Sequence, residues 1–382
     1  ETGMWLSMNG GESWESLQSN LPAVPITDLA VHKGMKDLVA ATQGRSFWVL
    51  DDLAVIHDLF DKRKEVEAAD VYLYPVEAAY RMPGGRARVQ GPPTFGENPT
   101  PGAVFNYRLK EKPKSELTIE VFDAAGKSVR ELSSKAESGE GEARSGAGGR
   151  RGRGAPEPLP AEPGVNRASW NMQYPDAKDF PGLILWAGSV SGPVAAPGKY
   201  TAKLTVGSTT VSREFEIRKD PRLSTTQQDF DKQLALLLQI RDKLTETHEA
   251  ILTVRDVRKQ VEDAAARYRD LPAGKEIGES AKALAKKLTA VEEELYQTKL
   301  QSSQDPLNYP IKLNNKLAAL GSIVGSADTA PTDQSYQLHE ELTSKINVQL
   351  RTLEGLLKAD LDAFNRLVKD KNVPAVLPAA KR

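Results

Sequence analysis

The spacing of apolar residues changes along the chain and separates a β-rich part from a helical part. Over residues 1–60 apolar residues alternate in short stretches that are divided by turn residues, a pattern that predicts β-strands. Asn9-Gly10-Gly11 suits the positive φ angles of a tight hairpin turn, with Trp14 on the returning strand. The strands are expected at Met4–Met8, Ile26–Val31, Asp37–Ala41 and Ser46–Leu50.

A second β region is predicted over residues 61–220. It begins with the alternating stretch Val71-Tyr72-Leu73-Tyr74, and a connector rich in Pro and Gly follows from Met82 to Gly102. Short strands separated by turn signals, as in an immunoglobulin-like β-sandwich, are then expected. Their ranges are Ala103–Leu109, Glu116–Phe122, Ser128–Leu132, Val165–Met172, Leu183–Trp186, Tyr200–Val206 and Thr210–Ile217.

Residues 133–164 form a compositionally biased insertion within this second region. Its arginine cluster, Gly149-Arg150-Arg151-Gly152-Arg153-Gly154, has the residue types of an RNA-binding segment. The cluster lacks the interleaved aromatic residues on which bases stack, and acidic residues lie close to it. We therefore expect a disordered, solvated loop, because the segment has too few large apolar residues to offset its ordering entropy.

From Asp220 the apolar spacing lengthens to three and four residues, which predicts helices over residues 221–382. A long first helix is expected at about 225–270 and ends before Leu271-Pro272-Ala273-Gly274. A second helix, a short third helix ending near Gly321, and a fourth helix after Pro331 follow. Short connections between helices with apolar stripes predict an antiparallel bundle or helical hairpin.

Composition narrows the classes of function. The 382 residues are enough for two or three domains, and a formal charge of −1 argues against a nucleic-acid partner. No apolar run is long enough to span a membrane, and the chain contains no Cys. The four His residues lie far apart without metal-ligand spacing. We therefore predict no metal site, no cofactor and no membrane span.

The first hairpin carries a recognisable motif. Ser7, Asn9, Gly11, Ser13 and Trp14 resemble the Asp-box of bacterial sialidase-type and sortilin-like β-propellers, with Asn9 in place of Asp and Ser13 in place of Thr. A short polar side chain at position 9 can bond backbone amides of its own turn, and the indole can pack across the hairpin. We therefore expect a structural role for these five residues, and the catalytic residues remain unknown.

Three further stretches extend this resemblance in chain order. Gln43–Asp52 is similar to the end of the last propeller blade, Gly164–Met172 to a strand of a hook-cap type immunoglobulin-like domain, and Gln304–Leu317 to the C-terminal region of the same family. The family consists of secreted bacterial BNR-repeat, glycosyl-hydrolase-like proteins. The resemblance implies a C-terminal portion of such a protein, located outside the cell, in the periplasm or in the cell envelope.

The resemblance also implies partners and two functions. One or two blades cannot close a propeller, so the missing blades of the same protein are expected partners. A carbohydrate is the implied substrate or ligand, and the helical region is a candidate for self-association. The chain is either the accessory end of a glycan-cleaving enzyme or part of a non-catalytic binding or scaffolding protein.

Candidate residues for glycan cleavage are few. A glycosidase needs two carboxylates at a set separation, and Asp51, Asp52 and Asp58 are the acids near the expected blade end. Asp is also common in turns and helix caps, which is the interpretation that we favour for these three. Arg45 alone does not form the arginine cluster that binds a sialic acid carboxylate.

Overall fold

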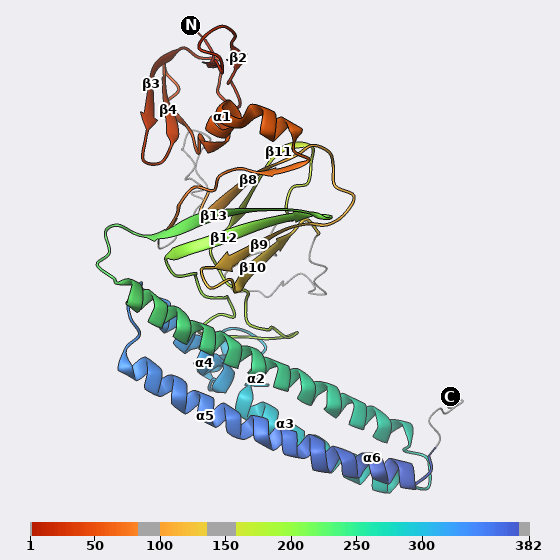
Figure 1. Cartoon of the computed structure of the whole chain (residues 1–382). Helices are drawn as coiled ribbons and strands as arrows, with labels where there is room; N and C mark the ends of the chain where they lie inside the picture. The colour runs from red at the N-terminus through yellow and green to blue at the C-terminus, as the bar shows by residue number, and fades with distance from the viewer. Residues whose placement is uncertain (1, 83–99, 136–157, 374–382) are drawn as a thin grey trace. The chain divides into compact units, whose positions relative to one another are not determined.

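The computed structural model describes residues 2–82, 100–135 and 158–373 (Figure 1). These residues form β-sheets followed by a C-terminal helical region. They divide into two compact units, which we name the β unit and the helical unit. The β unit contains residues 2–82, 100–135, 158–173 and 196–224, and the helical unit contains residues 174–195 and 225–373.

Two small antiparallel sheets begin the β unit. Strands β1 (Trp5–Leu6) and β2 (Glu15–Ser16) form a hairpin. Strands β3 (Ile26–His32), β4 (Asp37–Thr42) and β5 (Phe47–Leu50) form a three-stranded sheet in that order. The strands expected in this part of the chain are therefore confirmed, with ends that differ by one or a few residues.

Helix α1 (Ala54–Ala68) follows β5 and was not predicted from the sequence. Its buried residues are only Ala54, Asp58 and Val66, so the helix lacks the continuous apolar stripe that reveals a helix in a sequence. Val66 packs with Tyr72 and Tyr74 in a small apolar cluster. Tertiary contacts with the next strand therefore stabilise a helix that is otherwise mostly polar.

The remaining strands of the β unit form two further sheets. A five-stranded sheet has the order β10-β9-β12-β13-β7, and a three-stranded sheet has the order β11-β8-β6. Neighbouring strands are antiparallel except β7 and β13, which are parallel. The bounds are β6 (Val71–Leu73), β7 (Ala79–Arg81), β8 (Ala103–Leu109), β9 (Leu117–Asp123), β10 (Ser128–Ser133), β11 (Gly164–Trp170), β12 (Gly198–Val206) and β13 (Thr209–Lys219).

Aromatic residues connect these two sheets. The rings of Phe105 on β8 and Phe215 on β13 meet edge to face at 5.7 Å, and those of Trp170 on β11 and Tyr200 on β12 meet at 6.0 Å. All four side chains are at most 5 % exposed. The alternation that predicted these strands therefore directs one face of each sheet into a shared core.

One predicted strand is wrong. Residues Leu183–Trp186 are irregular, and the whole connection between β11 and β12 over residues 174–195 belongs to the helical unit. Leu183 and Leu185 of this run pack against the core of the helical unit instead of a sheet, which explains why the run resembles a strand in the sequence. Most of the expected insertion 133–164, including its arginine cluster, lies outside the described residues.

Five α-helices form the helical unit, in which α2, α3 and α5 run side by side (Figure 1). The first begins at a capping box, because Thr226 Oγ1 accepts from Asp229 N while the Asp229 carboxylate accepts from Thr226 N. The elements are α2 (Gln227–Arg267), α3 (Gly274–Leu295), the 3₁₀ turn η1 (Asp305–Leu307), α4 (Leu313–Val324), α5 (Asp333–Gly355), the π segment η2 (Leu356–Asp360) and α6 (Leu361–Asp370).

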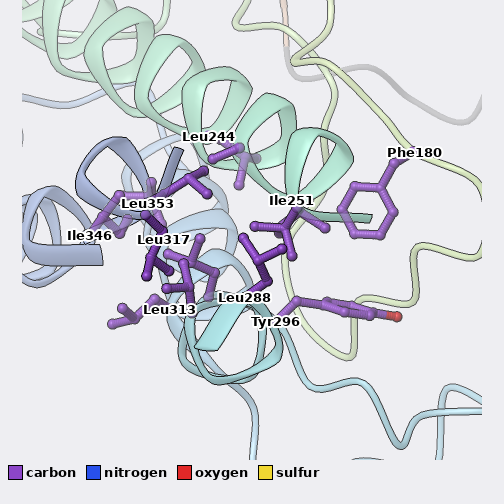
Figure 2. Packing of buried hydrophobic residues seen from close by; sticks show 14 of the residues in the cluster. Phe180, Leu244, Ile251, Leu288, Tyr296, Leu313, Leu317, Ile346 and Leu353 are labelled. Carbon is purple, nitrogen blue, oxygen red and sulfur yellow. The ribbon is translucent and has the colours of Figure 1, made fainter. Parts of the chain in front are cut away.

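The core of the helical unit lies between these helices. Leu244 and Ile251 from α2 meet Leu288 from α3 and Leu317 from α4 (Figure 2). Phe180 from the connection 174–195 and Tyr296 at the end of α3 lie beside this core. The predicted apolar stripes are thus buried, and the helical region is confirmed.

Candidate functional site

The five Asp-box residues lie together in the turn between β1 and β2. Ser7 Oγ accepts from Gly11 N at 2.7 Å, and Asn9 Oδ1 accepts from Ser13 N at 2.9 Å. Asn9 Nδ2 donates to Ser13 Oγ at 2.9 Å, and Trp14 Nε1 donates to Gly11 O at 3.2 Å. The polar groups therefore satisfy one another within the turn.

The ring of Trp14 is left largely uncovered, although its Nε1 bonds to Gly11 O. It is 59 % exposed, although Trp is a large apolar side chain whose burial releases much surface from water. The hairpin thus holds an aromatic ring in position without covering it.

The sheet β3-β4-β5 carries apolar residues on both of its faces. Residues paired across neighbouring strands share a face, so Leu29, Ala40 and Trp48 lie on one face. The other face carries Val39 with Val49 and Ala41 with Phe47. Exposed residues occur on both faces, including Leu29 at 52 % and Phe47 at 73 %. Neither face is fully covered by the described residues.

The Asp52 side chain forms hydrogen bonds that hold the start of α1 in place. It has a left-handed backbone with φ of 60°, its Oδ1 accepts from Ala54 N at 3.0 Å at the start of α1, and its Oδ2 accepts from Asn106 Nδ2 at 2.7 Å. Burial raises the pKa of Asp52 above its usual range, and the neighbouring Glu77 carboxylate adds to this effect. The side chain connects α1 to strand β8.

The other two candidate acids, Asp58 and Asp51, also interact with neighbouring groups in the β unit. Asp58 is 6 % exposed, accepts from Tyr72 OH at 2.5 Å and forms an ion pair with Lys62 at 3.0 Å. The pKa of Asp51 is raised by burial and then by the nearby Asp37 carboxylate. The structure does not bring Asp51, Asp52 or Asp58 into the lining of the cavity described next.

A shallow cavity of about 560 Å³ opens in the β unit. It lies between the turn that joins β3 to β4, the segment before β7, and strands β12 and β13. Its lining includes Lys36, Glu77, Tyr80, Lys199, Glu216 and Arg218. The volume is within the range of small-ligand sites.

Ion pairs organise the lining of this cavity. Lys36 Nζ binds Glu77 Oε1 at 2.5 Å, and Arg218 Nε binds Glu216 Oε2 at 2.8 Å. Lys199 lies opposite Glu216 in the strand register. The cavity therefore offers donors and acceptors side by side without an excess of either charge.

This cavity was not predicted from the sequence. Its charged residues come from separate segments, and each alternates with buried residues on a strand or lies in a turn. Such charges look like an ordinary solvated sheet face until the strand pairing is known.

Metal sites and membrane-spanning helices are the two remaining features to consider. Within residues 2–82, 100–135 and 158–373, no group of three or more His, Cys, Asp or Glu side chains is placed to hold a metal ion. None of the helices in those ranges is both long enough and apolar enough to cross a membrane.

Comparison of the chain with protein-family models, with curated proteins and with solved structures gives no match.

Proposed function

We propose that this chain is the C-terminal accessory region of a secreted, glycosyl-hydrolase-like β-propeller protein that binds or acts on carbohydrate. The observation that carries this proposal is the sheet β3-β4-β5, which carries large apolar residues on both faces and exposes some of them on each. Location in the periplasm or cell envelope is equally compatible with the proposal.

A propeller explains the two apolar faces. Each blade of a propeller packs between two neighbouring blades, so both faces of its sheet must be apolar. A sheet at the surface of a complete domain more often has one solvated, polar face. Additional blades would cover Leu29, Phe47 and the exposed indole of Trp14. The five Asp-box residues support the same interpretation through the bonds within their turn.

The rest of the β unit supports an immunoglobulin-like sandwich after the propeller. Two sheets share an aromatic core that includes Phe105, Trp170 and Phe215. Consecutive strands β12 and β13 form a hairpin, and β8 pairs with β11 across a long connection, as expected for Greek-key packing. The parallel pairing of β7 with β13 is an addition to that simple pattern.

The cavity beside Lys36 is our proposed carbohydrate site. Sugar hydroxyl groups both donate and accept hydrogen bonds, so they suit a lining in which ammonium, guanidinium and carboxylate groups alternate. The balanced charge favours a neutral sugar over an anionic one.

The second hypothesis, a non-catalytic binding or scaffolding protein, is favoured by the state of the carboxylates. Glu77 and Glu216 in the cavity are held in ion pairs, and Asp52 and Asp58 hold α1 in place. These arrangements favour binding by this chain, and any cleavage would be assigned to the additional blades.

Sugar release from a mixed panel of glycans separates the two hypotheses. The longer gene product and this 382-residue chain would be assayed together at several pH values. Release by the longer product alone would identify an enzyme with this chain as its accessory end. Release by neither, with binding of neutral glycans retained, would identify a binding scaffold.

Binding by this chain tests the cavity itself. Glu216→Ala removes the partner of Arg218, whereas Glu12→Ala changes an exposed acid of the first hairpin. We expect weaker binding of neutral glycans by Glu216→Ala and unchanged binding by Glu12→Ala. Equal binding by both variants would exclude this cavity as the site.

A further inference from the structure

His248 is a titratable side chain enclosed in the helical unit. It lies on α2, is 0 % exposed, and meets the ring of Phe180 edge to face at 4.9 Å. Its two ring nitrogens contact different parts of the unit. Nδ1 lies 2.5 Å from Lys178 O, and Nε2 lies 3.3 Å from Asn314 Nδ2 at the start of α4.

The neighbours of His248 determine where its proton lies. Asn315 N donates to Asn314 Oδ1 at 2.7 Å, which directs the Asn314 Nδ2 group towards the imidazole. Nε2 must then accept a hydrogen bond, and Nδ1 must carry the proton and donate to Lys178 O. The structure therefore requires the neutral imidazole with hydrogen on Nδ1.

A second proton would disturb this arrangement. Protonated Nε2 would direct an N–H group at the N–H groups of Asn314, and turning that amide around would break its bond from Asn315 N. The positive charge would also be enclosed without water, and burial already lowers the pKa of His248.

Two acidic groups on segments packed against α2 are engaged with other partners. In the connection, Asp179 Oδ1 accepts from Phe180 N at 2.7 Å. On α3, Glu292 binds Arg255 and Arg258 from α2 at 2.6 and 2.7 Å. From α4 the neighbour of the imidazole is the uncharged Asn314.

The connection 174–195, which we name the clamp loop, is attached to the helices by backbone bonds. Lys178 N donates to Thr245 Oγ1 at 3.1 Å on α2, and Ile184 N donates to Tyr296 OH at 3.3 Å. Trp186 N donates to Asn315 Oδ1 at 3.0 Å, while Asn315 Nδ2 donates to Ala187 O at 2.5 Å. His248 thus lies between Lys178 of the clamp loop and the start of α4, where Asn315 holds the middle of the loop at Trp186 and Ala187.

We propose that proton uptake by His248 releases the clamp loop from the helices in acid. The bonds of His248 go to Lys178 in the loop and to Asn314, whose neighbour Asn315 binds Trp186 and Ala187, so two of the loop's attachments are weakened together. The helices themselves are held by the apolar core and keep their packing.

The direction of the pH dependence follows from the two states. The clamped state disfavours the proton, whereas an imidazole that release of the loop exposes to water takes it up at the ordinary pKa of about 6.5. Attachment is therefore complete above that pH and weakens as the pH falls. The equilibrium constant for loop opening should rise by up to about tenfold per pH unit below about 6.5, until the lower pKa of the clamped imidazole is reached.

Amide hydrogen exchange of the whole chain from pH 8 to pH 4.5 measures this opening, after correction for the intrinsic pH dependence of exchange. The reporters are the amides of Lys178, Ile184 and Trp186, with amides of α2 and α3 as references. We expect the loop amides to lose protection in acid while the helical amides keep theirs. Loss of protection in loop and helices at the same pH would overturn the proposal.

Variants assign the effect to this one imidazole. His248→Asn keeps a side-chain donor for Lys178 O but does not titrate, so its loop should stay protected in acid. The matched control is His339→Asn, which removes a half-buried imidazole on α5 whose pKa is lowered by burial and by Lys243. The control should keep the acid opening. Acid opening in His248→Asn, or its loss in His339→Asn, would contradict the assignment.

Asn314→Asp provides an independent test that does not depend on the folding of His248→Asn. The aspartate keeps an acceptor for Asn315 N and places a carboxylate against Nε2, which favours the imidazolium in the clamped state. The pH at which the loop opens should therefore fall. An unchanged opening pH would refute the role of the Asn314 contact.

Discussion

Glu292→Ala is the substitution in the helical unit whose cost follows most directly from the structure. The Glu292 side chain is 2 % exposed, and its two carboxylate oxygens accept from Arg255 Nε at 2.6 Å and Arg258 NH1 at 2.7 Å. Arg255 also lies 4.7 Å from the ring centre of Phe180 and 5.5 Å from that of Tyr296. The carboxylate therefore fixes the guanidinium that packs against the clamp loop.

The magnitude can be estimated from these contacts. A hydrogen bond to a charged group contributes about 1.5–3 kcal/mol, and removing one partner of a buried pair costs about 3–5 kcal/mol. The two arginines are 29 % and 26 % exposed and can regain some water, so the lower end applies. We expect Glu292→Ala to lower the free energy of unfolding by about 3 kcal/mol and Tm by about 6–12 °C.

Thermal and urea unfolding followed by circular dichroism at the helical band would measure this loss. Glu293→Ala is the matched control, because Glu293 is the exposed neighbour on the same helix and should change stability by at most about 0.5 kcal/mol. Equal Tm values for Glu292→Ala and Glu293→Ala would refute the reasoning.

Three other outcomes are expected. Asn9→Ala should loosen the first hairpin, and Asn9→Asp should preserve the acceptor for Ser13 N; the amide shifts of residues 7–14 report both. Gly188→Ala should detach the clamp loop, because φ is +85° and a Cβ would lie 2.3 Å from the Ala318 carbonyl carbon; loss of loop amide protection measures this. Residues 1–60 alone should give no cooperative melt, since both faces of their sheet are apolar.

The strands and long helices could be predicted because their apolar period is regular. Strand β8 occupies Ala103–Leu109, the same range as expected, and α2 begins at Gln227, within two residues of the expected start. In both cases a continuous apolar face or stripe is buried in one core, so the period of apolar residues in the sequence matches the pattern of burial.

Two parts of the fold were not predicted correctly from the sequence, and the reasons are opposite. Helix α1 has little apolar surface and depends on contacts such as that of Asp58 with Tyr72, far apart in the sequence. The run Leu183–Trp186 is apolar but packs on helices, where it needs no strand geometry. Local pattern cannot separate these cases, because the deciding partner lies elsewhere in the chain.

The candidate site was likewise visible only in part. The Asp-box residues are close in sequence, so their spacing revealed the turn that contains Asn9 and Ser13. The cavity depends on distant pairs such as Lys36 with Glu77, and the imidazole of His248 depends on Lys178 and Asn314. These sites arise from tertiary packing, which the order of residues alone does not report.

Hydroxyl-radical footprinting tests the propeller proposal most directly. Side-chain labelling of Leu29, Phe47 and Trp14, all more than half exposed here, would be compared between this chain and the longer propeller protein of which we propose that it is a part. The propeller account predicts strong labelling in this chain and protection of all three in the longer product, where additional blades cover both faces of the sheet. Equal labelling in the two proteins would contradict it.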